Sequence, residues 1–146
     1  MAAYLSTELG GSANQTAAPT GYKPSASVYG GRVRRLRGTF TYNTQTTSDT
    51  LTVGTLPAGA TFVSGAITTS ASTSTATLAI GITGTTGKYR AAAAVTTTDV
   101  PQLFGTAATV GAASPLSAEE QVIVTIGTAS LPASGTLVVD LFYSMP

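Results

Sequence analysis

The clearest alternation of hydrophobic and polar residues lies near the C-terminal end of the chain, in two runs, Leu116–Gly127 and Leu131–Tyr143. The apolar rows of these runs are Val122, Val124 and Ile126 in the first, and Leu137, Val139, Leu141 and Tyr143 in the second. Because successive side chains of a strand point to opposite faces, each run predicts a strand that turns one apolar row toward a core.

The opposite faces of these two strands are not cleanly polar, because Ile123, Val138 and Phe142 lie there. A sheet that is apolar on one face and half-apolar on the other usually has its second face covered. We therefore expect these three residues to pack subunits together. Asp140 lies on the same strand face as Val138 and Phe142. Two roles stay open for it: a salt bridge to a neighbouring chain, or an internal or solvated position.

Short β segments separated by turn signals fill the middle of the chain, at the spacing of roughly 8–12 residues that is typical of a sandwich or barrel. The predicted strands are Ser48–Thr55, Thr61–Thr68, Thr75–Thr83 and, weakly, Thr106–Val110. Their expected inward residues are Leu51, Val53, Val63, Ile67, Leu78, Ile80 and Ile82, with Phe62 on the opposite face. With the terminal strands, this predicts about eight strands.

Two stretches of the middle region are less regular. Gly84–Gly87 is expected to be a turn, and Lys88–Val95 to be a strand or a single helical turn. Thr96–Gly105 predicts an irregular connection in which Leu103 and Phe104 close one end of the core.

Two similar segments each lead into a predicted strand: Thr55-Leu-Pro-Ala-Gly-Ala-Thr-Phe62 and Ser130-Leu-Pro-Ala-Ser-Gly-Thr-Leu137. Proline cannot donate to a strand ladder and glycine frees the backbone, so both segments predict turns that start a new strand. Two equivalent corners suit the two Greek keys of a jelly roll. Reuse of a common turn is the alternative.

Residues 1–31 predict an extended N-terminal arm, and residues 32–146 a β-sandwich domain. The arm is rich in Gly, Ser, Ala and Pro and shows neither a strand nor a helix period. Alone it could not offset the entropy of ordering. We expect a neighbouring chain to hold it, with folding back onto its own domain as the alternative.

Residues 32–43 predict a strand whose even-numbered face carries Leu36, Phe40 and Tyr42. The strand begins with a basic cluster, Arg32, Arg34, Arg35 and Arg37. Since Arg32 and Arg34 continue the even-numbered face, the strand is expected to run beyond the core and to meet solvent or a partner there.

Charge is distributed unevenly along the chain. The first 38 residues contain five basic side chains, Lys23 among them, and one acidic side chain, a net charge of +4; the rest contains two basic and five acidic side chains, a net charge of −3. A basic tract can bind phosphate backbones, but four arginines offer few contacts and Phe40 and Tyr42 are expected in the core, so nucleic acid is disfavoured. We predict that the four arginines and Lys23 contact an acidic protein surface, because the planar guanidinium pairs with carboxylates in a fixed geometry.

Composition narrows the function classes. Charged residues make up 9% of the chain, against about 25% in an ordinary globular protein. Because so few charges protect poorly against association, we expect the protein to be part of a dense assembly. The 146 residues contain neither Cys nor His, which removes disulfides, thiolate zinc sites and the commonest general base and metal ligand. Glu119 and Glu120 are expected in a solvated turn, and no phosphate-binding motif is present. We therefore predict a protein that is not an enzyme and has no cofactor and no metal.

The sequence contains no signal segment and no membrane helix, so we expect synthesis in the cytosol and no membrane partner.

The Gly/Ser/Ala arm and the Thr-rich body with Leu-Pro-Ala corners resemble the decoration (cement) proteins of tailed-bacteriophage heads. The resemblance covers residues 32–146 and is carried by Thr55-Leu-Pro-Ala-Gly59, by Lys88-Tyr-Arg-Ala-Ala-Ala, and by Leu131-Pro-Ala-Ser-Gly-Thr-Leu followed by Phe142-Tyr143. It implies an all-β, jelly-roll-like sandwich of about eight antiparallel strands. It further implies a homotrimer on the outer lattice of the major capsid protein in the virion, with its arm laid over capsid subunits and no catalytic residues.

Two other function classes stay open. A phage fibre or tail structural module would share the same composition and turn pattern. A glycan-binding receptor-recognition domain would need exposed aromatic platforms, and the chain has no Trp.

Overall fold

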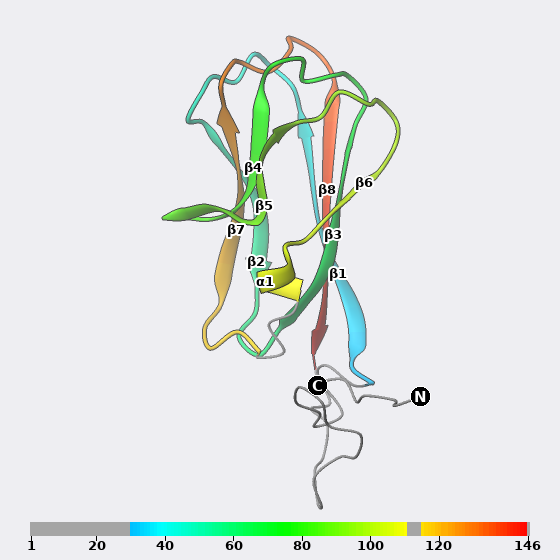
Figure 1. Cartoon of the computed structure of the whole chain (residues 1–146), viewed down its shortest axis with the longest axis vertical. Coiled ribbons are helices and arrows are strands. Elements are labelled where there is room, and N and C mark those ends of the chain that lie inside the picture. Colours follow the sequence, from blue (N-terminus) through cyan, green and yellow to red (C-terminus); the bar gives the residue numbers. More distant parts are fainter. Residues whose placement is uncertain (1–29, 111–114, 146) are drawn as a thin grey trace, which may run out of the picture.

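The computed structural model of the protein describes residues 30–110 and 115–145. Two four-stranded antiparallel sheets form a sandwich (Figure 1). Sheet A contains, in spatial order, β1 (Arg32–Thr41), β8 (Thr136–Met145), β3 (Thr61–Thr69) and β6 (Gln102–Phe104). Sheet B contains β2 (Thr50–Leu56), β7 (Glu120–Gly127), β4 (Thr77–Ile82) and β5 (Thr85–Ala94). The predicted all-β sandwich of eight strands is therefore confirmed.

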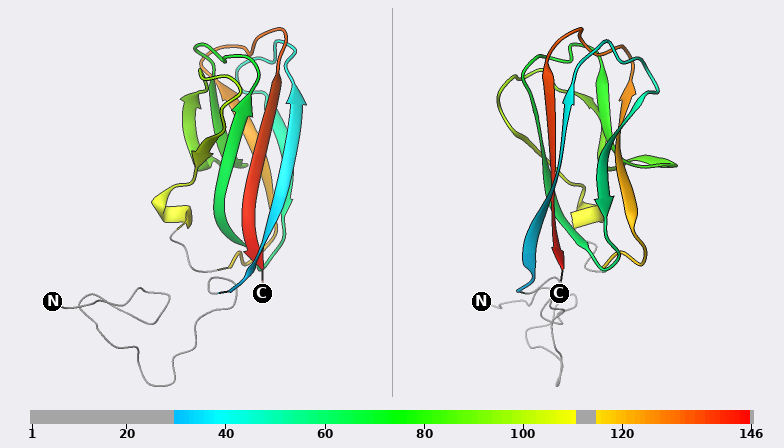
Figure 2. Two further views of the ribbon diagram at one scale, coloured as in Figure 1. Left: turned by 90° about the vertical axis from the view of Figure 1, so that its right-hand side faces the viewer. Right: turned by 180° about the vertical axis from the view of Figure 1, so that it is seen from behind.

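The strand pairs are nested in sequence. β1 pairs with β8, β2 with β7, β3 with β6 and β4 with β5. Such nested pairs arise when one long antiparallel hairpin, with all four pairs along its length, is rolled into two sheets. This is the jelly-roll-like arrangement. The left view of Figure 2 shows sheet A face-on, with β8 between β1 and β3.

The two C-terminal strands lie in different sheets, β7 in sheet B and β8 in sheet A, and each turns its inner row toward the core between the sheets. Their predicted inner rows are confirmed: Val122, Val124, Ile126, Leu137, Val139 and Leu141 are all buried in the main hydrophobic cluster. Leu36 and Phe40 of β1 pack against this cluster, and Tyr42 is inside it, also as predicted.

The prediction for the start of β3 was wrong. Val63 is 38% exposed and Phe62 is buried, the reverse of the expected orientation. The cause is a β-bulge: Phe62 pairs with Tyr143 and Ser64 with Phe142, so Val63 has no partner on β8. One extra residue reverses the alternation on one side of a bulge, which is why Ile67, beyond it, is buried as predicted.

Two connections also differ from the predictions. Of the two alternatives for Lys88–Val95, the strand is the one observed: β5 covers Thr85–Ala94. Because β5 begins at Thr85, the predicted turn at Gly84–Gly87 is limited to Gly84. The connection expected to be irregular contains the short strand β6, whose Phe104 ring packs over Gly65 of β3. Neighbouring strand residues point to opposite faces, so Leu103 is turned outward and is 80% exposed.

The weak strand predicted at Thr106–Val110 is instead a helical turn, α1 (Ala107–Val110). Thr106 Oγ1 accepts a hydrogen bond from the N–H of Thr109 at 3.2 Å, and Thr109 Oγ1 accepts one from the N–H of Thr106 at 3.1 Å. These reciprocal bonds cap the first turn of a helix, which outweighs the β propensity of threonine and valine.

The two Leu-Pro-Ala corners occupy equivalent places in the fold. Each leads from a strand of sheet B to a strand of sheet A, from β2 to β3 and from β7 to β8. Leu56 and Leu131, which begin the two corners, are both buried in the core. Apart from Gly30 and Gly31, the predicted arm lies outside the described residues.

Candidate functional site

The predicted partner-contacting arginines lie on β1, an edge strand of sheet A. The strand alternation divides them: Arg35 and Arg37 are on the outer face of the sheet, while Arg32 and Arg34 are on the side of the core at the end of the strand. All four are exposed. Charged side chains on an edge strand also discourage unwanted strand pairing, so part of this cluster serves the fold.

Asp140 of β8 binds two of these arginines within the same chain. Arg37 Nε donates to Oδ1 at 2.7 Å and Arg37 Nη2 donates to Oδ2 at 2.6 Å, while Arg35 Nε is 3.9 Å from Oδ1. The hydrogen bond to Asp140 raises the pKa of Arg37. This two-point geometry is the strongest form of an arginine–carboxylate pair. The internal role for Asp140, one of the two that the sequence leaves open, is the one observed.

The same face holds two of the three predicted interface residues. Phe142 is the cross-strand partner of Arg35, and Val138 is the partner of Thr39. Both are half-buried in the single chain. Ile123 lies instead on β7 in sheet B and is only 6% exposed, so it offers little surface to a partner without a rearrangement of the chain.

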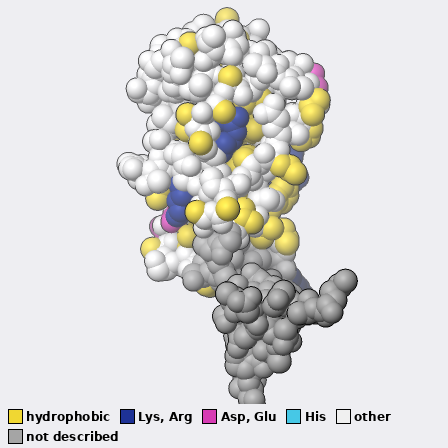
Figure 3. All heavy atoms as spheres, in the orientation of Figure 1, with side chains coloured by type: hydrophobic (Ala, Val, Ile, Leu, Met, Phe, Trp, Pro, Cys, Tyr) yellow, Lys and Arg dark blue, Asp and Glu magenta, His cyan; other side chains and the backbone are white. Residues whose placement is uncertain are grey.

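Two hydrophobic residues on this outer face were not among the candidates. Leu103, 80% exposed, is the register partner of Ala66, which in turn is opposite Asp140. Val33, 60% exposed, lies on β1 opposite Ser144. The signal for Leu103 was present in the sequence, since adjacent strand residues cannot both enter the core. Figure 3 shows hydrophobic side chains along the right-hand side of the molecule, where β6 lies, and few charges in that view.

Of the basic cluster, Arg32 and Arg34 make no ion pair within the part of the chain that the structure describes. Their guanidinium groups are therefore the positive charges of β1 that no carboxylate of the described residues offsets. Lys23, the remaining predicted contact, lies outside the described residues.

A second charged group lies at the other side of the sandwich. Glu120, which the sequence predicted to be solvated, begins β7 and is mostly covered. Its carboxylate accepts a hydrogen bond from the Tyr89 hydroxyl at 2.6 Å and one from Lys88 Nζ. The expectation of a solvated turn was wrong for Glu120 because its partners are on β5, far away in sequence. Glu119 is exposed, as predicted.

Tyr89 is held in its neutral form by this environment. Burial raises the pKa of the Tyr89 hydroxyl far above its usual value, and the hydrogen bond to Glu120 raises this pKa further. The unfolded chain releases this proton near pH 10, whereas the folded chain keeps it. The contribution of Tyr89 to stability is therefore complete below about pH 10 and is lost as the pH rises above that value.

We expect Tyr89→Phe to lower the free energy of unfolding at pH 7 by about 1–2 kcal/mol, since a hydrogen bond to a charged group is lost. The variant should also lose stability less steeply than the natural chain as the pH rises through about 10. Urea titrations at several pH values measure both effects. Tyr143→Phe is the control, because Tyr143 pairs with no carboxylate among the described residues. Equal slopes for the natural chain and Tyr89→Phe would contradict this prediction.

Neither charged group forms a recognisable chemical centre. Among residues 30–110 and 115–145, no three His, Cys, Asp or Glu side chains gather as metal ligands. None of the helices in this described part has the length and hydropathy needed to span a bilayer. The described residues instead offer exposed apolar side chains on the outer face of sheet A, and two exposed arginines, Arg32 and Arg34, at the end of β1.

The comparisons with known proteins point to a shared fold. No protein-family model and no curated protein matches this sequence. Among solved structures, a chain of the "Cyanophage Pam1 capsid asymmetric unit" has a TM-score of 0.64 and 22% identity, over 92% of this chain and 96% of that one. A chain of the "Capsid of Ralstonia phage GP4" has a TM-score of 0.64 and 19% identity, over 86% of this chain and 90% of that one. This protein is therefore similar in fold, over nearly its whole length, to chains of two phage capsids.

Proposed function

We propose that this protein is a structural protein of a tailed-phage virion, a decoration (cement) protein that binds the outer lattice of the major capsid protein and stabilises the head. The supporting observation is the similarity in fold, over nearly the whole chain on both sides, to chains of two phage capsids. A shared fold does not by itself give a function. The low charge and the hydrophobic outer face of sheet A add support from the chain's own surface.

In this proposal the protein acts mechanically. Each bound copy adds buried interface across neighbouring capsid subunits, so the free energy needed to separate them rises with occupancy. The arm, residues 1–31, and the free guanidinium groups of Arg32 and Arg34 contact the capsid. Val138 and Phe142 pack copies of the protein into a homotrimer, in which each cyclic contact joins two different patches.

Removal of residues 1–31 tests the role of the arm. We expect the shortened protein to bind capsids that lack the natural protein at least about tenfold more weakly, a loss of about 1.4 kcal/mol. Titration of such capsids with full-length and shortened protein, followed by sedimentation and quantification of the bound fraction, gives both affinities. Unchanged affinity and saturation by the shortened protein would rule out a gripping arm.

A further inference from the structure

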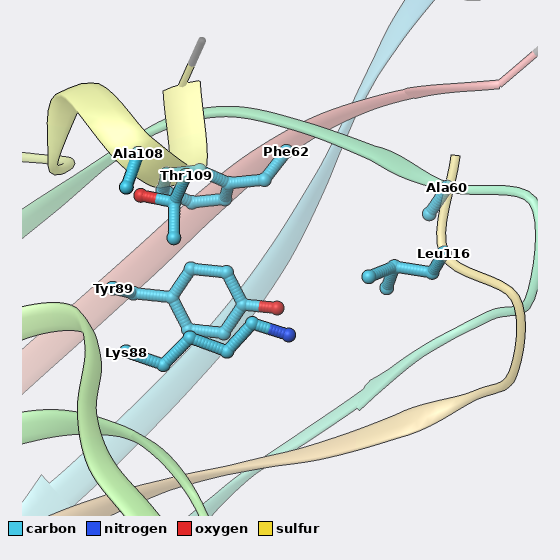
Figure 4. A pocket seen from close by; sticks show the side chains of 7 residues that line it. All are labelled: Ala60, Phe62, Lys88, Tyr89, Ala108, Thr109 and Leu116. Atoms are coloured by element: carbon cyan, nitrogen blue, oxygen red, sulfur yellow. The ribbon is translucent and has the colours of Figure 1, made fainter. Parts of the chain in front are cut away.

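A pocket opens between the start of β3, the strand β5, the helical turn α1 and the segment that leads into β7 (Figure 4). Its volume is about 140 Å³. The walls are mostly apolar and include Ala60, Phe62, Leu116 and the ring of Tyr89. Lys88, Thr109 and the exposed Ala108 of α1 complete the lining. The Phe62 and Tyr89 rings lie 4.7 Å apart at 47° to each other, so the pocket already presents aromatic surfaces.

The volume of the pocket limits the size of the group that it can hold. Pockets for cofactors and other small molecules usually measure about 300–1,000 Å³, which is far larger. A cavity of about 150 Å³ lined by Leu, Ile and Phe holds a benzene molecule, so this pocket fits one aromatic ring. Residues 111–114, which follow α1, are Gly, Ala, Ala and Ser and supply no ring.

The start of β1 lies close to this pocket. Val33 pairs with Ser144, and Ser144 pairs with Thr61, the neighbour of Phe62. The row spans three strands, so β1 begins about 10 Å from Thr61, at the usual strand spacing. The 29 residues before Gly30 therefore leave the domain at the end where the pocket opens.

The arm contains three tyrosines, Tyr4, Tyr22 and Tyr29. Tyr29 is one residue from Gly30, about 3.5 Å of extended chain, which is too short to cross β8 and reach the pocket. Tyr22 is eight residues from Gly30, about 26 Å of extended chain, which is sufficient. Tyr4 also reaches, but closing its longer loop costs more entropy.

Charge favours the same residue. Lys23 follows Tyr22 directly, and Tyr89 in the pocket wall is hydrogen-bonded to Glu120 at the start of β7. Glu120 is already paired with Lys88, whereas Glu119 is exposed and makes no ion pair among the described residues. Glu119 directly precedes Glu120 in the sequence, so a Tyr22 ring in the pocket would place Lys23 on the same side of the domain as this unpaired carboxylate.

We propose that, in the free protein, the arm folds back onto its own domain and inserts the ring of Tyr22 into the pocket formed by Phe62, Tyr89, Ala60 and Leu116. Attachment to the same chain gives the ring a high effective concentration at the pocket, which favours its own arm over that of another copy. This inference concerns the free chain and does not depend on the capsid role.

Cysteine pairs test the contact directly, because the natural chain contains no cysteine. In the full-length Tyr22→Cys/Ala108→Cys variant, we expect mild oxidation to give a disulfide within one chain, seen by intact mass and by non-reducing electrophoresis. A disulfide needs the two Cα atoms within about 7 Å. The control, Tyr4→Cys/Ala108→Cys, should react far less. Equal reaction of both pairs, or a product of twice the chain mass from the Tyr22 pair, would overturn the proposal.

A second measurement uses p-cresol, which is the side chain of tyrosine as a free molecule. Full-length Tyr22→Ser should show saturable NMR shifts at Phe62 and Tyr89 on addition of p-cresol, and the natural chain should show none over the same range. Because Tyr22 lies in the arm, its replacement leaves the core of the domain unchanged. Identical shifts in both proteins, or their absence from both, would contradict occupancy of the pocket by Tyr22.

Discussion

Gly81→Ala is expected to lower the free energy of unfolding by about 3 kcal/mol or more, at the upper end of what overpacking a core costs. A Cβ atom at Gly81 would lie 2.2 Å from the carbonyl oxygen of Thr85 and 2.6 Å from the carbonyl carbon of Thr86. Both atoms belong to the backbone of β5, so no side chain can rotate away. The register of β4 against β5 shifts between Ile80 and Ile82, and this irregularity brings the two backbones together at Gly81.

Gly87→Ala is the matched control, because it makes the same chemical change in the same hairpin. A Cβ atom there would meet Ala91 Cα at 3.5 Å, an ordinary contact. Glycine within a strand is less favourable than alanine by about 0.5–1 kcal/mol, so this variant should be unchanged or slightly more stable. Urea unfolding curves of the three proteins give the comparison. A similar loss for both variants would show that the cause is general to the hairpin and not the close approach at Gly81.

The elements that could be predicted are those that depend on local alternation. The inner rows of β7 and β8 follow from the pattern alone, because each strand is regular over its central part. The same holds for Leu78 and Ile80 in β4, both fully buried. Where a strand keeps its period, the burial of each side chain follows from its position in the sequence.

The failures have physical causes that local alternation does not contain. At Val63 a bulge inserts one residue and reverses the face. At α1 two threonine side chains cap a turn that β propensity argues against. Neither the bulge nor the caps leave a mark in a hydrophobic pattern, because both arise from how a short segment meets its neighbours.

In the candidate site, too, some features follow from the strand period and others depend on which strands become neighbours. Placing Val138, Asp140 and Phe142 in one row needs only the strand period, and the register confirms that they face outward together with Arg35 and Arg37. The pairing of Asp140 with Arg37 joins residues 103 positions apart, and that of Glu120 with Tyr89 joins residues 31 apart. Such pairs depend on which strands become neighbours, and the sequence pattern leaves that choice open.

Replacing Phe142 on the outer face should separate the subunits of the proposed trimer. Phe142→Asp places a charge where an apolar contact between copies is proposed, and burying that charge without a partner costs more than the contact contributes. Arg35, the cross-strand partner of Phe142, can pair with the new carboxylate in the isolated chain, since opposite charges directly across two strands attract. The single domain should therefore stay folded while the assembly is lost.

Sedimentation velocity and light scattering measure this outcome, and we expect the natural protein at the mass of three chains and Phe142→Asp at the mass of one. Thr52→Asp is the control, because Thr52 is an exposed residue of β2 in sheet B and its replacement adds the same charge. A trimer that survives Phe142→Asp would move the subunit interface away from β8, to surfaces such as the exposed side chain of Leu103. Dissociation of both variants would point to net charge as the cause, whereas dissociation of Phe142→Asp alone would identify the outer face of sheet A as the surface that joins the copies.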